Sequence, residues 1–333
     1  MNRNLAIVVL TWNDYKNTIK CLKTLLNQSY RDGKIILIDN NSNDGSCYKI
    51  IQWLNKNYKN QIYDKFVNPW SLLSNNIFKK KVFIIKNPIN YGCGMGHNPG
   101  YKFAIKNNFK LVARIDNDMN VPRNFFKNIL QNFNNPNIKA ISPKILYDQN
   151  KKIIWWKGCT IQHNLKFDKH LRNYPYNLLD SKNFKGLINT DAIAGCASIM
   201  RCDRLKKVGL SDKDFFYGPE DIEFSKRIYD SKDSLKVDLN VKIYHGVRQS
   251  FLKRKSQRIY YESKYRLVLI SKIGTFWDKT LGYSTAIIKF LLYCMLFLKK
   301  KHKNKIVPVG FAIIHFFLKK WGDFDRKMDF KLK

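Results

Sequence analysis

Alternation between apolar runs and amphipathic stretches constrains the fold of this chain more than any other feature. Apolar runs typical of buried parallel strands lie at residues 5–11, 34–38, 82–86 and 111–115. Between them, residues 15–27, 46–58 and 96–107 are predicted helices, supported by apolar side chains at helical spacing or by capping residues. This order predicts an α/β fold with a doubly wound, mostly parallel sheet flanked by helices.

One segment does not fit this alternation. Residues 60–81 separate two predicted strands and contain Pro69-Trp70 and Asn75-Asn76. We expect a long connection here, and a connection of this length in a compact domain forms a lid, a binding insert or a disordered segment.

Polar clusters follow the predicted strands, where ligands bind in sheets of this kind. They are Thr11-Trp12-Asn13, Asp39-Asn40-Asn41, a glycine-rich segment at 90–100, and Asp116-Asn117-Asp118. The glycines predict close approach of the backbone to a ligand, or simply a tight turn. The segment has neither the dinucleotide fingerprint nor the Gly-Lys-Ser/Thr ending of a phosphate-binding loop.

The most informative polar cluster is the pair of carboxylates Asp116 and Asp118. Side chains two apart on a strand share a face, and two such charges need a cation or a proton between them. Magnesium favours oxygen ligands and bridges to substrate phosphates. The pair therefore predicts a metal–diphosphate site, with capping of a following helix as the alternative.

The formal charge of +36 in 333 residues points to an anionic partner: nucleic acid, an anionic membrane or a phosphate-bearing substrate. The alternative is a solvated surface from a sequence rich in Lys, Asn and Ile. The basic residues are dispersed and no known nucleic-acid-binding module is present, which disfavours nucleic acid. The 7 cysteines form no C-x-x-C pair, which suits a reducing cytosol. Because the chain enters a strand-like run at once, we expect no signal peptide.

The motifs together resemble family-two glycosyltransferases, closest to bacterial rhamnosyltransferase-like and galactofuranosyltransferase-like members. The resemblance covers residues 4–270. It includes the four polar clusters described above and two later motifs, Gly218-Pro219-Glu220-Asp221-Ile222-Glu223-Phe224 and Tyr244-His245. Trp12, Pro99 and the 60–81 segment depart from the usual pattern. The resemblance implies a GT-A (Rossmann-like) fold, a nucleotide-diphosphate sugar donor, a divalent metal and inversion at the anomeric carbon. It also implies a glycan or lipid-linked acceptor in cell-surface polysaccharide synthesis.

The resemblance also assigns residues to the donor and to the metal, which would be Mn or Mg. Asp116, Asp118 and His245 would hold the metal, although a lone His is often purely structural. Asp39 would accept hydrogen bonds from the base or ribose, or else cap a helix. The implied donor-binding set is Thr11, Trp12, Asn13, Asp39, Asn41, Asn90, Gly92, Gly96, Asn98, Asp116 and Asn117.

Asp221 is the candidate general base, because an inverting transfer needs a carboxylate to take the proton of the acceptor hydroxyl. It opens a predicted helix at 222–229, so plain capping is the alternative. Glu220 and Glu223 are neighbours that could share or take the role. Asp191 is a weaker rival, at the start of a strand-like segment, residues 191–200, that we expect to line the acceptor side.

The C-terminal part has a different character. After a predicted helix to about residue 272, apolar pieces at 281–298 and 306–318 are interrupted by Lys289 and Pro308, and neither is long enough to predict a membrane span. The lysine-rich segment 299–305 lies between them and favours interfacial attachment to an anionic membrane. The alternative is a helical appendage packed on the catalytic domain, with homo-oligomer contacts.

These expectations divide the chain into a catalytic domain at 1–272 and a basic helical region at 273–333. The nucleotide-binding half would span about 1–120 and the acceptor half about 121–272. The location would be cytoplasmic, peripheral on the inner face of the cell membrane. An inactive transferase-like scaffold is the remaining hypothesis, and the presence of Asp116, Asp118, Asp221 and His245 argues against it.

Overall fold

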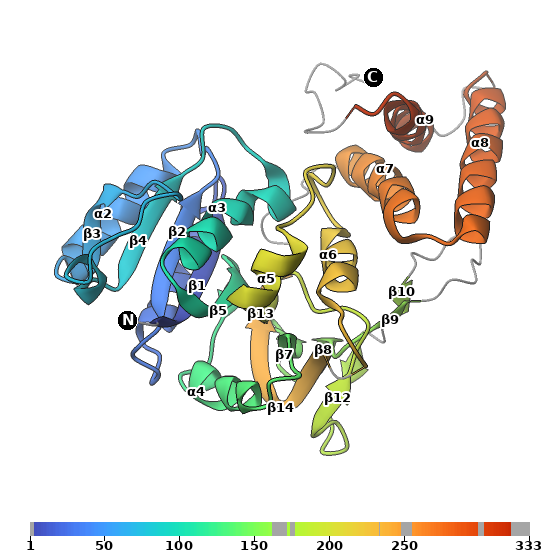
Figure 1. Ribbon diagram of the computed structural model, residues 1–333. Coiled ribbons are helices and arrows are strands. Elements are labelled where there is room, and N and C mark those ends of the chain that lie inside the picture. Colours follow the sequence, from blue (N-terminus) through green and yellow to red (C-terminus); the bar gives the residue numbers. More distant parts are fainter. Residues whose placement is uncertain are drawn as a thin grey trace.

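The computed structural model describes residues 3–161, 172–173, 177–232, 234–247, 255–298 and 303–320. A twisted sheet with helices on both faces forms the larger part, and the C-terminal helices stand beside it at the upper right of Figure 1. The mixed α/β architecture with a C-terminal helical appendage confirms the predicted fold class.

The predicted parallel strands all form and pair as neighbours. They are β1 (Arg3–Thr11), β2 (Lys34–Asp39), β4 (Val82–Lys86) and β5 (Phe109–Asp116). The connecting helices are α1 (Tyr15–Leu26), α2 (Ser46–Tyr58) and α3 (Gly92–Lys106). Strand β1 lies between β2 and β5, so the turns after these three strands meet at one edge of the sheet.

The core explains why the strands are apolar throughout. Leu5, Ile7 and Val9 pack into one core cluster with α1 and α2, while Ala6 and Val8 pack into another with α3. Because successive side chains point to opposite faces, a strand covered on both sides favours apolar residues at nearly every position.

Residues 60–81 are more ordered than a long connection. They contain β3 (Ile62–Phe66), which extends the sheet parallel to β4, and a 3₁₀ turn, η1 (Ile77–Lys79). The strand escaped prediction because it is an edge strand with an exposed face that includes Phe66. Phe78 anchors the turn, with its ring centroid 5.3 Å from that of Phe83.

The glycine-rich segment is also different from the expectation, since α3 begins at Gly92 rather than Gly96. Gly92 has φ of +75°, and the amide of Cys93 donates to the Phe216 carbonyl at 2.8 Å. This bond and the left-handed glycine turn the chain into the helix four residues early.

The second half of the chain extends the sheet beyond β5. Strand β13 (Ala197–Arg201) lies antiparallel between β5 and β7 (Ala140–Tyr147), and β14 (Leu235–His245) runs parallel to β7. The segment expected as a strand at 191–200 is thus extended only from residue 197. The remaining strands are β6 (Met119–Asn120), β8 (Ile153–Trp156), β9 (Thr160–Ile161), β10 (Arg172–Asn173), β11 (Leu178–Leu179) and β12 (Leu187–Asn189).

Short helices cover this half: α4 (Phe125–Ile129), η2 (Leu130–Asn134), α5 (Cys202–Val208) and α6 (Glu220–Ile228). The C-terminal helices are α7 (Lys255–Ile273), α8 (Phe276–Leu298) and α9 (Lys303–Phe317). Tyr260 and Tyr261 of α7 share a buried apolar cluster with Phe216 and with Ile313 of α9, so the appendage packs on the catalytic part. The boundary expected at residue 272 falls at the end of α7.

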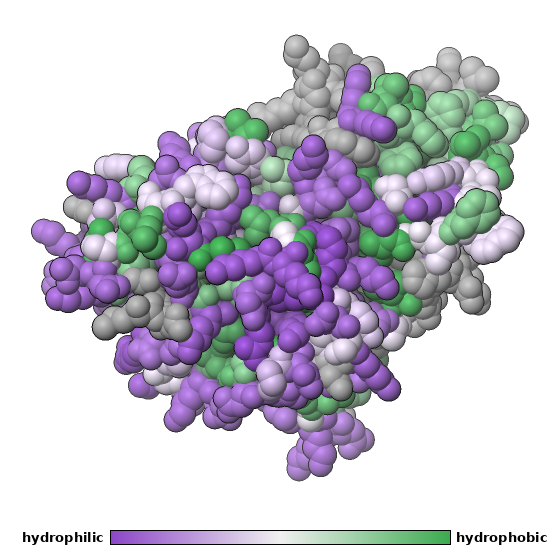
Figure 2. All heavy atoms as spheres, in the orientation of Figure 1, coloured by the Kyte–Doolittle hydropathy of each residue, from purple (hydrophilic) through white to green (hydrophobic). Residues whose placement is uncertain are grey.

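Among the described residues, no helix is both long and apolar enough to cross a membrane. Figure 2 shows a mostly hydrophilic face, with hydrophobic side chains gathered at the upper right, over the C-terminal helices.

Candidate active site

Asp116 stands at the end of β5, where the sheet fixes its position on two sides. It is in register with Leu10 of β1, and its amide donates to the Cys196 carbonyl at 2.9 Å. Its Oδ1 lies 3.8 Å from both His97 Nε2 and Arg114 Nε. Desolvation raises the pKa of Asp116 to about 6, with Arg114 opposing this shift and Asp118 adding to it. A cation near this carboxylate would therefore be favoured.

Asp118 and His245 face each other with Asp118 Oδ1 and His245 Nε2 3.2 Å apart. Strand β6 brings them together, because Met119 is in register with His245 and the Gly246 amide donates to the Asp118 carbonyl. The ring of Trp155 packs edge-on against His245, with centroids 4.7 Å apart. Burial opposes the charge on His245, but Cys196 and the Asp118 carboxylate raise its pKa well above the ordinary value.

Asp39 ends β2 and is 1% exposed. Its Oδ1 accepts from the Ser42 amide at 3.3 Å, whereas Oδ2 is buried without a hydrogen-bond partner among the described residues. Helix α2 begins after Gly45, so Asp39 does not cap it. A buried acceptor without a partner is costly unless a ligand satisfies it, which suits a base or ribose donor.

The asparagines and Thr11 around this carboxylate hold the turns in place. Asn13 and Asn41 both have left-handed backbones, with φ of 51° and 62°. Asn13 exchanges hydrogen bonds with Asn43, and Thr11 bonds Thr18 at 2.7 Å. Trp12 between them is half-buried.

Asn117, between the two carboxylates, is tied to the start of α1. Its Nδ2 donates to Asp14 Oδ2 at 3.2 Å and lies 3.1 Å from the Thr18 hydroxyl. These bonds orient the turn that carries Asp116 and Asp118.

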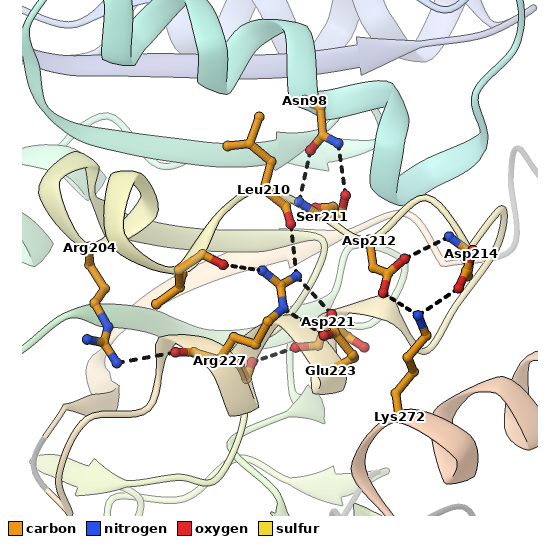
Figure 3. A network of polar contacts seen from close by, with 12 residues as sticks. Asn98, Arg204, Leu210, Ser211, Asp212, Asp214, Asp221, Glu223, Arg227 and Lys272 are labelled. Atoms are coloured by element: carbon orange, nitrogen blue, oxygen red, sulfur yellow. Dashed lines mark hydrogen bonds and ion pairs between the residues drawn. The ribbon is translucent and has the colours of Figure 1, made fainter.

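The glycine-rich segment approaches the protein's own chain rather than open space for a ligand. A Cβ at Gly92 would lie 1.9 Å from the Phe216 carbonyl oxygen, and one at Gly96 would lie 2.7 Å from Leu10 Cδ2. Asn90 accepts from Asn40 Nδ2 at 2.7 Å. Asn98 bonds the backbone of Ser211 in both directions, as Figure 3 shows. In this structure these residues position the segment.

Asp221 lies in the first turn of α6 and is partly exposed. Its Oδ2 accepts from the Gly195 amide at 3.2 Å. Glu223 is buried against Arg227 at 2.6 Å, and Glu220 is buried against Arg114 at 2.9 Å. Asp191 accepts from the Ile161 amide at 2.7 Å. Each glutamate is paired with an arginine, whereas Asp221 and Asp191 accept from backbone amides, so these two remain the candidates for a free base.

Arg114 and His97 are residues of the site that sequence reasoning missed. Arg114 links both sides, because it pairs with Glu220, next to Asp221, and lies near Asp116. It is 5% exposed, and a charged residue inside an otherwise apolar strand was the available signal. His97 is buried in α3, and burial together with Arg114 lowers its pKa well below the ordinary value.

The fold is similar to that of several solved glycosyltransferases. S. aureus TarS matches with a TM-score of 0.50 and 13% identity, over 87% of this chain and 43% of that one. The mannosyltransferase PcManGT from Pyrobaculum calidifontis, in complex with GDP-Man and Mn²⁺, matches with a TM-score of 0.54 and 11% identity, over 96% and 88%. GalNAc-T7 with UDP, GalNAc and Mn²⁺ matches with a TM-score of 0.55 and 13% identity, over 85% of this chain and 54% of that one. The chain thus spans less than half of TarS and about half of GalNAc-T7.

A comparison with curated protein sequences gave no match. These structural likenesses at low identity show the GT-A fold. The model of the family described as "Glycosyl transferase family 2" matches residues 6–209, which is more than half of the chain. The chain therefore belongs to glycosyl transferase family 2.

Proposed function

We propose that this chain transfers a hexosyl or deoxyhexosyl group from a nucleotide-diphosphate sugar to a glycan or lipid-linked acceptor, with inversion, in cell-surface polysaccharide synthesis. The observation that carries the proposal is the contact of Asp118 with His245 at 3.2 Å. Nearby in the sequence, Arg114 lies close to Asp116 and pairs with Glu220, the neighbour of Asp221. Two structural neighbours contain Mn²⁺ with GDP-Man or UDP, which supports the same donor chemistry here.

The residues present fit a divalent cation. The carboxylate of Asp118 and the imidazole of His245 face each other and offer two protein ligands. Because the described part of the chain contains no cluster of three or more His, Cys, Asp or Glu side chains able to enclose a metal, oxygens from the substrate would have to supply the remaining ligands. Asp118 and His245 would hold Mn or Mg, with diphosphate oxygens completing the ligands. When bound, the metal would neutralise charge on the departing diphosphate.

The other residues of the chain have separable roles. The buried Oδ2 of Asp39 would accept a hydrogen bond from the base or ribose of the donor. Asp221 would take the proton of the acceptor hydroxyl. Arg114 holds the turn before Asp221 through Glu220 and stays charged, because Glu220 and Asp116 outweigh burial and raise its pKa.

A thermal-shift screen of nucleotide sugars with and without Mn²⁺ tests the proposal. A ligand at about 100 times its Kd stabilises a folded protein by about 2.7 kcal/mol, which shifts the melting temperature measurably. We expect one nucleotide family to stabilise the chain, and more so with metal. Salt-sensitive binding of random RNA without any nucleotide-sugar response would instead support the nucleic-acid hypothesis.

Asp118→Asn sharpens the test, because it keeps the size of the side chain and a contact with His245 but removes the charge. Metal-dependent donor binding, measured by calorimetry, should be lost while the far-UV spectrum is unchanged. Asp44→Asn, in the turn before α2, is the matched control and should bind normally. Full transfer activity in excess chelator would contradict the metal assignment.

A further inference from the structure

We propose that the outward face of α8 is a docking surface for an anionic lipid membrane. This face, called the α8 stripe, consists of Trp277, Leu281, Ser284, Ile288, Leu291 and Met295. The proposal concerns a surface apart from Asp118 and Asp221, so it stands or fails separately from the transfer reaction.

The α8 stripe is an uncharged, mostly apolar band in which Ser284 is the one polar member. Its members follow one another at alternating spacings of four and three residues, which puts them on one side of a helix. Trp277 is 69% exposed, Leu291 is 57% exposed and Met295 is 55% exposed. The band runs over about 28 Å at 1.5 Å per residue. Phe276, Ile287 and Leu292 widen it, and all three are exposed as well.

The opposite side of α8 explains why this face points outward. Gly282 and Ala286 are buried, and a Cβ at Gly282 would lie 2.9 Å from Ile270 Cδ1 of α7. Small side chains let the two helices approach closely. Helix α9 packs on α7 as well, with Tyr260 Oη 2.7 Å from His315 Nδ1. The three helices therefore bury a core of their own, and the side chains of the α8 stripe are not part of it.

Charge identifies the occupant. Between Lys279 and Lys299 the only charged residue is Lys289, seven positions after the buried Gly282 and so on the inward side. Directly after α8 the sequence is Lys299-Lys300-Lys301-His302-Lys303-Asn304-Lys305. An uncharged apolar band that ends in clustered lysines suits acyl chains beneath anionic headgroups.

A second copy of the chain is the competing occupant, because a spacing of four and three also fits a coiled-coil seam. Two observations favour the membrane. The positions beside the stripe carry Ile287, Leu292 and hydroxyl side chains instead of the charged pairs that set the register of a coiled coil. A second chain would also bring another charge of +36 next to the same lysine run, whereas anionic lipid would neutralise it.

Trp277 and Phe276 begin the stripe, with ring centroids 5.5 Å apart and both rings exposed. Aromatic rings favour the headgroup level of a bilayer. The geometry therefore points to a helix lying in the plane of the interface, with these rings at its first turn, while in the sequence the lysine run follows its last residue.

The test is sedimentation of the full chain with vesicles of phosphatidylcholine alone or mixed with phosphatidylglycerol, at low and high salt. Wild-type protein should bind the mixed vesicles and should bind less at high salt. Ile288→Asn with Leu291→Asn should lower the partition about tenfold or more, because each change removes an exposed aliphatic side chain that lipid would bury. Leu72→Asn with Leu179→Asn, at exposed sites away from α8, should leave it unchanged.

Light scattering of the same variants without lipid measures their oligomeric state and so tests whether a second copy covers the stripe. A stable oligomer that the α8 variant converts to monomer, together with equal sedimentation on neutral and mixed vesicles, would overturn the proposal in favour of a second copy. Wild-type sedimentation that the α8 variant does not reduce would overturn it as well. The far-UV spectrum and the thermal unfolding midpoint of the α8 variant serve as the check of folding, since neither depends on the transfer reaction.

Discussion

At the scale of single residues, the acidic side chains of the site differ in what they contact. Glu220 and Glu223 are each buried against an arginine, whereas Asp221 is partly exposed and receives only backbone amides among its assigned hydrogen bonds. Desolvation and partners, rather than residue type, thus decide which carboxylate can act as a base.

Asp221→Asn keeps the shape of the side chain but removes its ability to take a proton. We expect the single-turnover transfer rate to fall about 10²–10⁴-fold, the usual contribution of a general base. Donor affinity by calorimetry should hardly change, because Asp221 would face the acceptor. Asp191→Asn is the matched control and should retain most activity. If instead the Asp221 variant keeps the wild-type rate, the base role passes to Asp191.

Arg114→Met leaves the Glu220 carboxylate buried without its cation. Breaking a buried pair in this way costs about 3–5 kcal/mol of unfolding free energy. Both side chains are about one-twentieth exposed, so solvent screening is small. Chemical denaturation should show this loss, and the double variant with Glu220→Gln should recover part of it, since both charges are then gone. Equal stability of the single and double variants would argue that the pair is not coupled.

At the scale of elements, contacts between segments far apart in the chain position the loop that leads to the candidate base. Figure 3 shows how the 210–214 segment is held between α3, α6 and α7. Asn98 bonds Ser211, Arg227 Nη2 donates to the Leu210 carbonyl, and Lys272 bonds both Asp212 and Asp214. These contacts fix the loop that leads to Phe216 and on to the Asp221 turn.

Gly92→Ala should destabilise the start of α3. A methyl group there would meet the Phe216 carbonyl oxygen, and the left-handed backbone of +75° adds strain. Gly186→Ala is the matched control, because its φ is +89° but nothing lies within 4 Å of its Cβ. The control should lose only the strain of about 1–2 kcal/mol. Thermal unfolding of both variants measures the difference, and equal losses would exclude a steric role for Phe216.

Lys272→Met should remove up to about 1 kcal/mol of unfolding free energy, since the pair is partly exposed. Burial would raise the pKa of Asp212, but the hydrogen bond from Lys272 outweighs it and the pKa lies below its ordinary value of 3.8. Likewise, the two carboxylates outweigh burial and raise the pKa of Lys272 above 10.5. The ion pair therefore contributes its full stabilisation between pH 3.8 and pH 10.5, the ordinary pKa values of the two groups.

The sign at each end follows from the direction of the shift. The contribution is lost as the pH falls through the lowered pKa of Asp212, and as it rises through the raised pKa of Lys272. Denaturation curves of wild type and Lys272→Met should converge at both extremes. Lys226→Met, at an exposed position of α6, should show no such pattern. A difference that stays constant with pH would contradict the pairing.

At the scale of the whole molecule, the C-terminal helices and the catalytic part share an apolar core. Phe215, Phe216 and Ile222 lie in one buried cluster with Tyr265 of α7 and Phe316 of α9. The loop that carries the Asp221 turn therefore rests on the appendage. The division at residue 272 stays a prediction about sequence regions, and it need not mark parts that fold alone.

Truncation after Gly274 should destabilise the chain, because it uncovers the side of α7 that α8 and α9 bury. Tyr260, which contacts His315 of α9, and Ile270, which lies against Gly282 of α8, would become exposed. Each large apolar side chain loses about 1.5–3 kcal/mol on exposure. Limited proteolysis should show faster cleavage within α7, and thermal unfolding a lower midpoint. A truncated chain as stable as the full one would mean that the catalytic part is independent.

The sequence by itself determined the parallel half of the sheet, because strands buried on both faces must be apolar throughout and the helices between them have their own periodicity. It also marked Asp39, Asp116, Asp118, Asp221 and His245 through their motifs. The tertiary structure alone decided that Asp118 contacts His245 and that Glu220 forms an ion pair with Arg114. It also decided that the glycines allow close packing inside the protein. These contacts join residues about 100 positions or more apart, and local patterns cannot encode which distant partner a side chain meets.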